Sequence, residues 1–341
     1  MKKYLLECRN NYEEETRFNA GSKARNDIIK ILEQIDFESI ILNISEEKLK
    51  KVVQSVKIGK ELNRIEENSV VAIQYPFQGR FITKKVLKVL AQKKCKTIAI
   101  IHDIDTLRYR DLEEKKYKEI ELFNIFDVII CHNRFMGKWI KENGVKSQCI
   151  NLNLFDYLVD EQKQIKKMSE NIVFAGNLSE NKSGFIYKLN DINLNLYGAN
   201  LNKNKLEQNI NYLGKFEPEK LPGELKGKYG LIWDGESIES CEGDTGEYLK
   251  YNNPHKLSLY MAAGMPVIVW DESAIAEFVK KEKIGFSIGN LNEINEKIEK
   301  NECKYDEYIM NCKEIQRKVL NGEYIKESIE KAIQYDEEKV K

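Results

Sequence analysis

The sequence predicts an α/β protein made of two Rossmann-like, doubly wound domains. The chain has 341 residues, whereas single hydrophobic cores seldom grow beyond about 250–300 residues. Short apolar runs alternate with helical patterns from one end to the other, which is typical of βαβ units. Most of these runs are continuously apolar, as expected of strands that are covered on both faces. Together these observations predict two parallel sheets.

The apolar runs form two series of predicted strands. The first series lies at residues 4–8, 39–42, 70–74, 97–102, 128–131 and 148–152. The second series lies at residues 172–175, 194–197, 210–213, 230–233, 266–270 and 285–288. Helical spacing occurs between the strands, for example at residues 22–34, 83–92, 134–143, 254–263 and 273–281.

The domain boundary is predicted at the polar stretch 160–167, which we interpret as a short hinge. We expect an N-terminal domain over residues 1–155 and a second domain over residues 156–305. A charged helical pattern at 304–335 predicts C-terminal helices, within residues 306–341, that pack towards the N-terminal domain. Sheets of this kind bind ligands at the carboxyl ends of their strands. Chemistry is therefore expected in the loops that follow the strands.

The composition excludes several classes of protein. Lys and Arg number 55 and so do Asp and Glu, so no overall field attracts nucleic acid, and any anion site must be local. The seven cysteines are odd in number and form no CxxC pair, which disfavours disulfide or metal use. No apolar run approaches the ~20 residues of a membrane span, and no signal peptide is evident. We expect a cytoplasmic protein without a transmembrane segment.

The strongest local feature is the segment Asn252-Asn253-Pro254-His255-Lys256 before an apolar helix. Asn253 is predicted to be the N-cap and Pro254 the first helical residue. Lys256 then lies in the first turn, where a cation opposes the helix dipole unless an anion is bound there. The segment favours a phosphate site, and the alternative is an ordinary helix with a solvated lysine.

The pattern over residues 253–268, Asn-Pro-x-Lys-x-x-x-Tyr-Met-Ala-Ala-Gly-x-Pro-Val-Ile, resembles the donor-binding segment of glycosyltransferases with the GT-B architecture. The order of motifs resembles the bacterial glucosyltransferases that extend glycans on serine-rich-repeat adhesins, and related galactofuranosyltransferases, over nearly the whole chain. This resemblance implies two Rossmann-like domains facing across a cleft, with C-terminal helices crossing back. It also implies that the second domain binds a UDP-sugar.

The resemblance further implies which residues contact the donor. They are Asn19, Gly21, Gly176, Asn177, Lys182, Tyr212, Tyr248, Asn252, Asn253, Pro254, His255 and Lys256. Several have a structural alternative. Asn19 and Gly21 lie in a long loop that could simply lead into a capped helix, and Lys182 could be plain surface. Tyr212 could belong to the core, and Tyr248 ends a run of turn residues expected to be a loop.

A dense titratable cluster follows the strand at 97–102, comprising His102, Asp103, Asp105 and Arg108. Sugar transfer to a hydroxyl with inversion needs a base, and an imidazole or carboxylate at a strand end can serve. A neighbouring Arg would keep a carboxylate ionised or orient an acceptor. The alternative is a polar strand end whose Asp residues cap the next helix. His102 and Asp103 both remain candidates for the base.

Other polar groups are interpreted more simply. His132 is expected to be a satisfied turn histidine, and Tyr75 and Phe77 to pack in the core rather than form an acceptor wall. Asp103 and Asp105 match a DxD motif, but in the first domain rather than beside the donor. We therefore expect a reaction without metal or cofactor, in which cationic groups and a helix N-terminus neutralise the leaving diphosphate.

The expected function is transfer of a hexose, glucose first, from a UDP-sugar to a sugar hydroxyl on a glycoprotein or surface glycan. Its partners are then the UDP-sugar and a glycan or glycosylated acceptor, without nucleic acid, and we expect a homo-oligomer. The alternatives are a galactofuranosyltransferase of polysaccharide synthesis, a UDP-sugar epimerase, and a non-catalytic subunit that binds a partner transferase.

Overall fold

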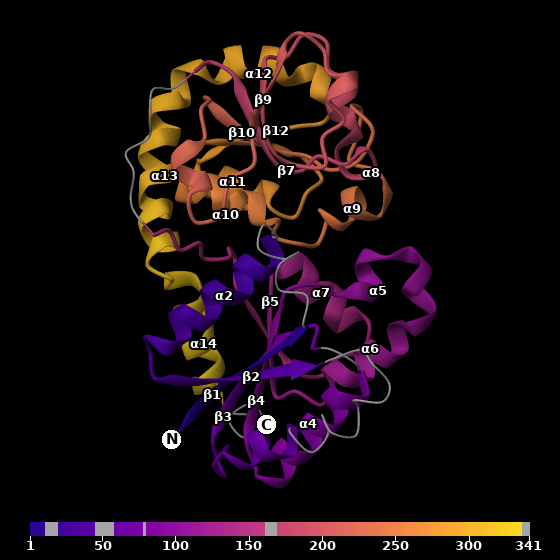
Figure 1. Ribbon diagram of the computed structural model, residues 1–341, viewed down its shortest axis with the longest axis vertical. Coiled ribbons are helices and arrows are strands. Elements are labelled where there is room, and N and C mark those ends of the chain that lie inside the picture. Colours follow the sequence, from indigo (N-terminus) through magenta and orange to yellow (C-terminus); the bar gives the residue numbers. More distant parts are fainter. Residues whose placement is uncertain (11–19, 45–57, 78–79, 161–168, 336–341) are drawn as a thin grey trace. The chain divides into compact units, whose positions relative to one another are not determined.

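The computed structural model describes residues 1–10, 20–44, 58–77, 80–160 and 169–335 (Figure 1). The chain divides into two compact units. The first comprises Met1–Leu152 together with Tyr324–Lys341, and the second comprises Asn153–Glu323. Each unit holds one six-stranded sheet flanked by helices.

The sheet of the first unit has the strand order β2-β1-β3-β4-β5-β6, and all its neighbours pair in parallel. Its strands are β1 (Lys3–Asn10), β2 (Phe37–Ile44), β3 (Val70–Tyr75), β4 (Lys96–Ile101), β5 (Val128–Cys131) and β6 (Gln148–Asn151). The helices of this unit include α2 (Ala20–Glu33), α4 (Arg80–Gln92), α5 (Asp105–Arg108), α6 (Lys116–Phe123), α7 (Arg134–Glu142) and α14 (Glu323–Gln334).

The sheet of the second unit has the order β12-β11-β10-β7-β8-β9 and is also parallel throughout. Its strands are β7 (Ile172–Asn177), β8 (Leu194–Ala199), β9 (Ile210–Gly214), β10 (Tyr229–Ile232), β11 (Val267–Trp270) and β12 (Gly285–Ile288). Its helices are α8 (Glu180–Ser183), α9 (Gly243–Tyr248), α10 (His255–Ala262), α11 (Ala276–Glu282), α12 (Ile294–Asn301) and α13 (Tyr305–Leu320).

The predicted α/β fold with two parallel sheets is confirmed, and each of the twelve strands lies where an apolar run predicted it. The runs succeed as predictors because the strands are buried on both faces: every residue of β3, β5, β10 and β11 is buried. The core of the second unit includes Phe174, Trp233 and Trp270 on neighbouring strands or at their ends.

Each sheet has one point where its strand order reverses. In the second sheet the chain runs outward from β7 to β9 and then returns to β10 on the other side of β7. In the first sheet the corresponding point lies between β1 and β3. Doubly wound sheets bind ligands in the crevice outside such a switch point. Both points lie beside residues that the sequence marked as chemical.

The C-terminal segment differs from the expectation. The helical pattern at 304–335 forms two helices because Asn321 caps α13 and Gly322 adopts a left-handed φ of 71°. Helix α13 packs on α10 in the second unit, and only α14 joins the first unit. Residues 306–341 are therefore divided between the two units, and packing of α13 towards the N-terminal domain stays a prediction.

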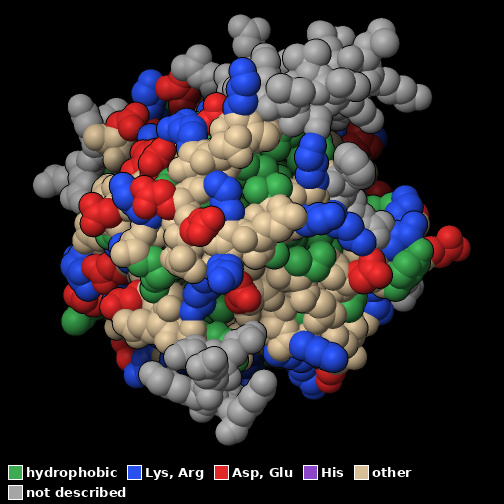
Figure 2. Space-filling view, turned by 90° about the horizontal axis from the view of Figure 1, so that it is seen from below, with side chains coloured by type: hydrophobic (Ala, Val, Ile, Leu, Met, Phe, Trp, Pro, Cys, Tyr) green, Lys and Arg blue, Asp and Glu red, His purple; other side chains and the backbone are tan. Residues whose placement is uncertain are grey.

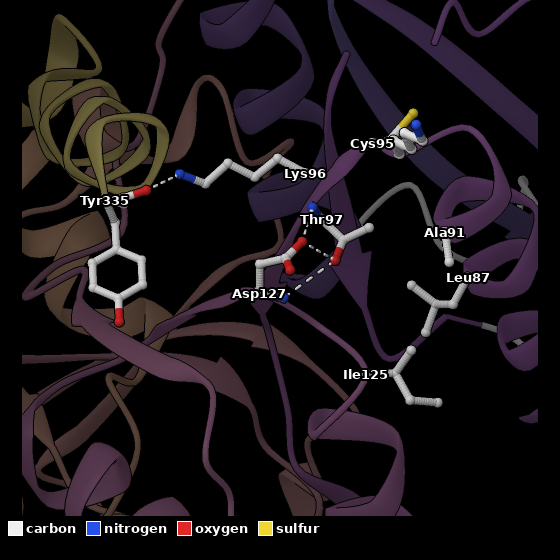
Figure 3. A pocket seen from close by; sticks show the side chains of 9 residues that line it. Leu87, Ala91, Cys95, Lys96, Thr97, Ile125, Asp127 and Tyr335 are labelled. Carbon is white, nitrogen blue, oxygen red and sulfur yellow. Dashed lines mark hydrogen bonds between the residues drawn. The ribbon is translucent and has the colours of Figure 1, made fainter. Parts of the chain in front are cut away.

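Helix α14 is fastened to the amino ends of β4 and β5 (Figure 3). Lys96 donates to the carbonyl oxygen of Ile333 at 2.9 Å and also to that of Tyr335. Beside it, the Asp127 carboxylate accepts from the backbone and the hydroxyl of Thr97 at 2.6 and 2.8 Å. These side chains line a cavity of about 440 Å³. Lys96, Thr97 and Asp127 make their hydrogen bonds with one another or with the end of α14. We therefore interpret this end of the sheet as the place where α14 is attached.

The surface carries both signs of charge. Basic and acidic side chains lie interspersed over the face of the molecule seen in Figure 2, in keeping with the 55 charges of each sign. Among the described helices, none has the length and apolar content needed to cross a membrane.

Candidate functional site

The switch point of the second unit lies between β7 and β10. Over the described residues these strands pair only at Tyr229 with Ile172 and at Gly230 with Val173. Their carboxyl ends, which lead into Asn177 and Trp233, are therefore not joined to each other by the ladder. A crevice at this position is where a doubly wound sheet takes its ligand.

A buried tyrosine hydroxyl occupies the place where the ladder stops. Tyr260, on the fully buried face of α10, accepts from the backbone N–H of Ala175 at 3.0 Å. Its oxygen also lies 3.2 Å from the carbonyl oxygens of Val173 and Leu231, on β7 and β10 respectively. Burial raises the pKa of Tyr260, so the hydroxyl keeps the proton that it donates. The tyrosine thus satisfies backbone groups that strand pairing would otherwise use.

Lys256 lies one turn before Tyr260 and reaches the same crevice. Its ammonium group pairs with the carboxylate of Asp234, just after β10, and lies 3.5 Å from the carbonyl oxygen of Trp233. It also stands 4.8 Å from the centroid of the Phe174 ring. A Cβ added at Gly176 would approach Lys256 Cε to 3.0 Å, so the glycine lets β7 end close against this side chain.

The anion beside Lys256 is thus a protein carboxylate in this structure. The side chains of Lys256 and Asp234 are only 11% and 9% exposed, so the pair is held within the crevice rather than solvated. Asp234 was not among the residues that the sequence singled out. Its position at the end of β10, next to the switch point, was the feature that could have singled it out.

The start of α10 differs in detail from the prediction. Pro254, not Asn253, is the N-cap residue, and its own side chain makes no capping hydrogen bond. Asn253 is buried and donates to the carbonyl oxygen of Asn153 at 3.0 Å. His255 packs with its ring centroid 5.3 Å from that of Tyr157 and 6.0 Å from that of Phe155. Through these contacts the side chains of Asn253 and His255 stabilise the start of α10.

Three other predicted donor residues lie around the end of β7. The Asn177 carboxamide oxygen accepts from the backbone of Ser179 at 3.1 Å and thereby shapes the loop. Lys182, in α8, accepts from the Gly235 N–H at 2.7 Å through its carbonyl oxygen, which ties α8 to the loop after β10. Tyr212, on the edge strand β9, donates to the carbonyl oxygen of Gly198 at 2.9 Å. Donor contacts of all three remain predictions.

Two predicted loops are helical instead. Residues Gly243–Tyr248 form α9 rather than a loop, and Tyr248 is buried at 3% exposure, so its ring packs in the core. Gly21 lies in the first turn of α2, which begins at Ala20, rather than in a loop. A run of turn-forming residues did not prevent helix formation because the helix is stabilised by tertiary burial. Asn19 lies outside the described residues.

In the first unit the predicted cluster lies at the carboxyl end of β4. His102 follows the strand, donates its backbone N–H to the carbonyl oxygen of Tyr75 at 2.7 Å, and contacts Gln74 through its ring at 2.8 Å. Arg108 donates to the carboxylate of Asp103 at 2.9 Å. Burial raises the pKa of Asp105, and the nearby Arg108 guanidinium opposes this shift. The structure therefore joins His102 to β3 and couples Asp103 with Arg108.

The short helix α5 is positioned by hydrogen bonds to Glu119. This buried carboxylate accepts from the N–H and the hydroxyl of Thr106 at 3.1 and 2.5 Å, and from the Tyr75 hydroxyl at 2.5 Å. Glu119 thus positions the segment that carries Asp105 and Arg108. The sequence offered no indication of this role, since the residue lies on an ordinary charged helix.

Buried polar groups also line the switch point of the first sheet. Arg25 of α2 donates to both carboxylate oxygens of Glu7 at 3.1 Å. Burial raises the pKa of Glu7, and the Arg25 guanidinium opposes that shift. Lys23 pairs with Asp27 at 2.5 Å, with both side chains 1% exposed. The sequence pattern does not single out these ion pairs, because Lys23, Arg25 and Asp27 look like ordinary helix charges and Glu7 is one polar residue of a strand.

The simpler interpretations of His132, Tyr75 and Phe77 agree with the structure. His132 contacts the carbonyl oxygen of Ile101 at 3.1 Å, and burial lowers its pKa to about 4. Tyr75 and Phe77 are 6% and 4% exposed and pack in the core. Within the described ranges, the His, Cys, Asp and Glu residues form no group of three or more with the arrangement of a metal site.

Comparisons with known proteins agree with this arrangement. The family description "Glucosyltransferase 3-like, N-terminal domain" matches residues 8–154, and "Glucosyltransferase 3-like, C-terminal domain" matches residues 172–332. The beta-1,6-galactofuranosyltransferase WbbI of Escherichia coli (strain K12) is 34% identical over 332 residues, which cover 93% of this chain and 96% of that protein. Glucosyltransferase 3 of Streptococcus gordonii is 25% identical over 288 residues, which cover 81% and 82%.

Solved structures share the fold. The sucrose-phosphate synthase (tll1590) of Thermosynechococcus elongatus superposes with a TM-score of 0.61 at 10% identity, over 98% of both chains. Anabaena Alr3699/HepE, solved with UDP and glucose, superposes with a TM-score of 0.57 at 12% identity, over 98% of this chain and 100% of its own. At such identities these likenesses show the two-domain α/β architecture alone.

Proposed function

This chain belongs to the glucosyltransferase 3-like family of glycosyltransferases, and from that premise we propose that it transfers a hexosyl group from a UDP-sugar to a hydroxyl of a sugar acceptor. In the reaction, the bond between the anomeric carbon and the diphosphate oxygen breaks. A bond to the acceptor oxygen forms, the hydroxyl proton passes to a base, and UDP leaves.

The observation that carries the proposal is the position of Lys256 at the switch point of the second sheet. The ammonium group lies where the end of β7 near Gly176, the end of β10 and the first turn of α10 converge. A cation together with the N–H groups of a helix start favours a phosphate. Since both supply positive charge to a departing diphosphate, we propose that the transfer needs no metal.

Two hexoses are proposed for the donor. The sequence pattern favoured glucose, and a glucosyltransferase relative is 25% identical to the chain. The galactofuranosyltransferase relative is 34% identical and covers more of the chain, which supports galactofuranose at least equally. The acceptor would accordingly be a glycan of a glycoprotein or a growing polysaccharide.

The acceptor is proposed to meet the first unit at the carboxyl end of β4. There His102 supplies an imidazole and Arg108, bonded to Asp103, supplies a fixed guanidinium. Such a set can orient a sugar through its hydroxyl groups and remove one proton.

Incubation with each UDP-hexose tests the donor. We expect UDP-glucose or UDP-galactofuranose to release UDP, slowly alone and faster with a hexoside acceptor. Excess EDTA should change the rate less than about twofold, because protein cations neutralise the diphosphate. Conversion of the donor into another UDP-hexose without transfer would identify an epimerase instead. Absence of UDP binding by calorimetry would contradict the proposal.

The acceptor cluster is tested by Asp103→Asn. This change removes the anion that holds Arg108, in a pair whose side chains are 34% and 24% exposed. We expect kcat to fall at least about 10-fold, as for loss of a positioned charged group, with the Kd for UDP unchanged within about twofold. Glu121→Gln serves as the control, since it breaks the exposed pair with Lys84, which contributes little. Full turnover in Asp103→Asn would remove the pair of Asp103 and Arg108 from the reaction.

We further propose that the protein acts in the cytoplasm. All seven cysteines are free thiols, which is typical of a reducing compartment. The expected homo-oligomer stays a prediction, for which light scattering is the direct measurement.

A further inference from the structure

A buried glutamine contacts the histidine of the acceptor cluster. Gln74 lies near the end of β3 and is 0% exposed. Its carboxamide oxygen is 2.8 Å from Nε2 of His102, at the end of the neighbouring strand β4. The contact alone does not say which ring nitrogen carries the proton, because a carboxamide can either donate or accept.

The orientation of this carboxamide is set by Arg25. The Gln74 amide nitrogen donates to the carbonyl oxygen of Arg25 at 3.3 Å. Arg25 is itself fixed, because its guanidinium pairs with Glu7 and donates to the carbonyl oxygen of Pro76 at 2.9 Å. A carbonyl oxygen can only accept, so the NH₂ end of Gln74 must face Arg25 and the oxygen must face His102.

We propose that Gln74 holds neutral His102 in the tautomer with the proton on Nε2, so that Nδ1 bears the lone pair that takes up the acceptor proton. Gln74 is then a positioning residue that acts through His102. The tautomer follows from the contacts of Gln74 alone, whereas the proton transfer rests on the proposed function. This assignment decides between the two candidates for the base, His102 and Asp103.

The surrounding charges agree with this choice. The Asp103 carboxylate accepts from Arg108 at 2.9 Å and is therefore already engaged by a guanidinium. From β5, His132 approaches the backbone of His102, and burial lowers its pKa to about 4; it is therefore neutral near pH 7. Beyond Gln74 stands the ion pair of Arg25 with Glu7. The ring of His102 thus contacts a neutral carboxamide, whereas Asp103 pairs with a guanidinium.

Nuclear magnetic resonance of the full-length protein tests the tautomer directly. The chain has three histidines, so ¹⁵N-labelled histidine gives few ring signals, and His102→Asn identifies those of His102. Long-range proton–nitrogen correlations above the ring pKa should show a protonated Nε2 and an unprotonated Nδ1. A protonated Nδ1 would overturn the proposal.

Kinetics of two Gln74 variants test the role in transfer. Gln74→Glu places a carboxylate beside Nε2, which favours the imidazolium and raises the pKa of His102. Since the base must be neutral, the acidic limb of the kcat profile should move upward by about one pH unit or more. Gln74→Met removes the acceptor and should lower kcat about 10- to 100-fold. The Kd for UDP should stay within about twofold in both variants.

The control is Gln148→Glu, which replaces another glutamine by glutamate, on β6. It should leave the acidic limb of the kcat profile unchanged. A purely structural role of Gln74 predicts lower stability without movement of the limb, and that outcome would overturn the proposal. If Gln74→Met does not fold, the NMR tautomer of the wild type and the pH profile of Gln74→Glu still test the proposal. A protonated Nε2 in a protein that transfers no sugar would contradict the proposed function and leave the tautomer standing.

Discussion

Replacement of Lys256 by alanine is expected to weaken UDP binding about 10- to 100-fold, as measured by titration calorimetry at fixed salt. The reason is loss of one charge-assisted hydrogen bond to the diphosphate, worth about 1.5–3 kcal/mol. The variant also leaves the Asp234 carboxylate, whose side chain is 9% exposed, facing the ligand without its counter-ion. We expect kcat to fall as well, because the same cation neutralises the leaving group.

Asp234→Asn separates a binding role from a structural one. If Lys256 serves the diphosphate, removing its protein partner frees the ammonium group, and UDP binding should be equal to wild type or tighter. If the pair only supports the fold, both single variants should weaken binding together with the melting temperature. Lys250→Ala is the matched control, because Lys250 also pairs with carboxylates, those of Glu247 and Glu272. An unchanged Kd for UDP in folded Lys256→Ala would contradict the phosphate role.

Replacement of Gly230 by alanine is expected to destabilise the second unit. An added Cβ would lie 2.4–2.6 Å from three ring carbons of Tyr260, well inside van der Waals contact. The ring cannot move easily, since its hydroxyl holds backbone groups of β7 and β10. Overpacking of this kind costs about 1–3 kcal/mol or more. The melting temperature should fall by several degrees, at about 2–4 °C per kcal/mol for a unit of this size.

A double-mutant cycle checks the mechanism of that loss. In a Tyr260→Ala background the clash is absent, so adding Gly230→Ala should cost much less than it does in the wild type. Gly59→Ala is the control, because an added Cβ there meets nothing within 4 Å. A melting temperature of Gly230→Ala within about 1 °C of wild type would mean that the ring does not press on the sheet as described.

The fold was predictable because its strands are short and buried on both faces. A continuous apolar run such as residues 128–131 predicts a strand wherever it occurs, and turns or helices between runs supply the βαβ order. Helix ends were less predictable. Residues Gly243–Tyr248 were predicted to form a loop but form α9, and Gly21 lies inside α2. Helix propensities of most residue types differ by only fractions of a kcal/mol. The free energy gained by burying one face of a helix can exceed such differences.

The candidate site was predictable in part for a related reason. Parallel strands place their carboxyl ends along one edge, so residues that follow strands, such as His102 and Gly176, were expected to carry chemistry. The motif around Lys256 was visible because a cation in the first turn of a helix is unfavourable without an anion. The sequence could not say that this anion is Asp234 in the protein itself.

By itself, therefore, the sequence determined the two parallel sheets, the family resemblance and the strand-end residues, because these depend on local pattern and short-range order. Only the tertiary structure decided which partners those residues have. In the sequence, Asp234 is 22 residues away from its partner Lys256, and Gln74 is 28 residues away from His102. Tyr260, whose hydroxyl contacts Ala175, is 85 residues away from it. Such contacts arise from strand order and helix placement across the whole unit, and hydrogen bonds at that separation leave no periodic trace in the chain.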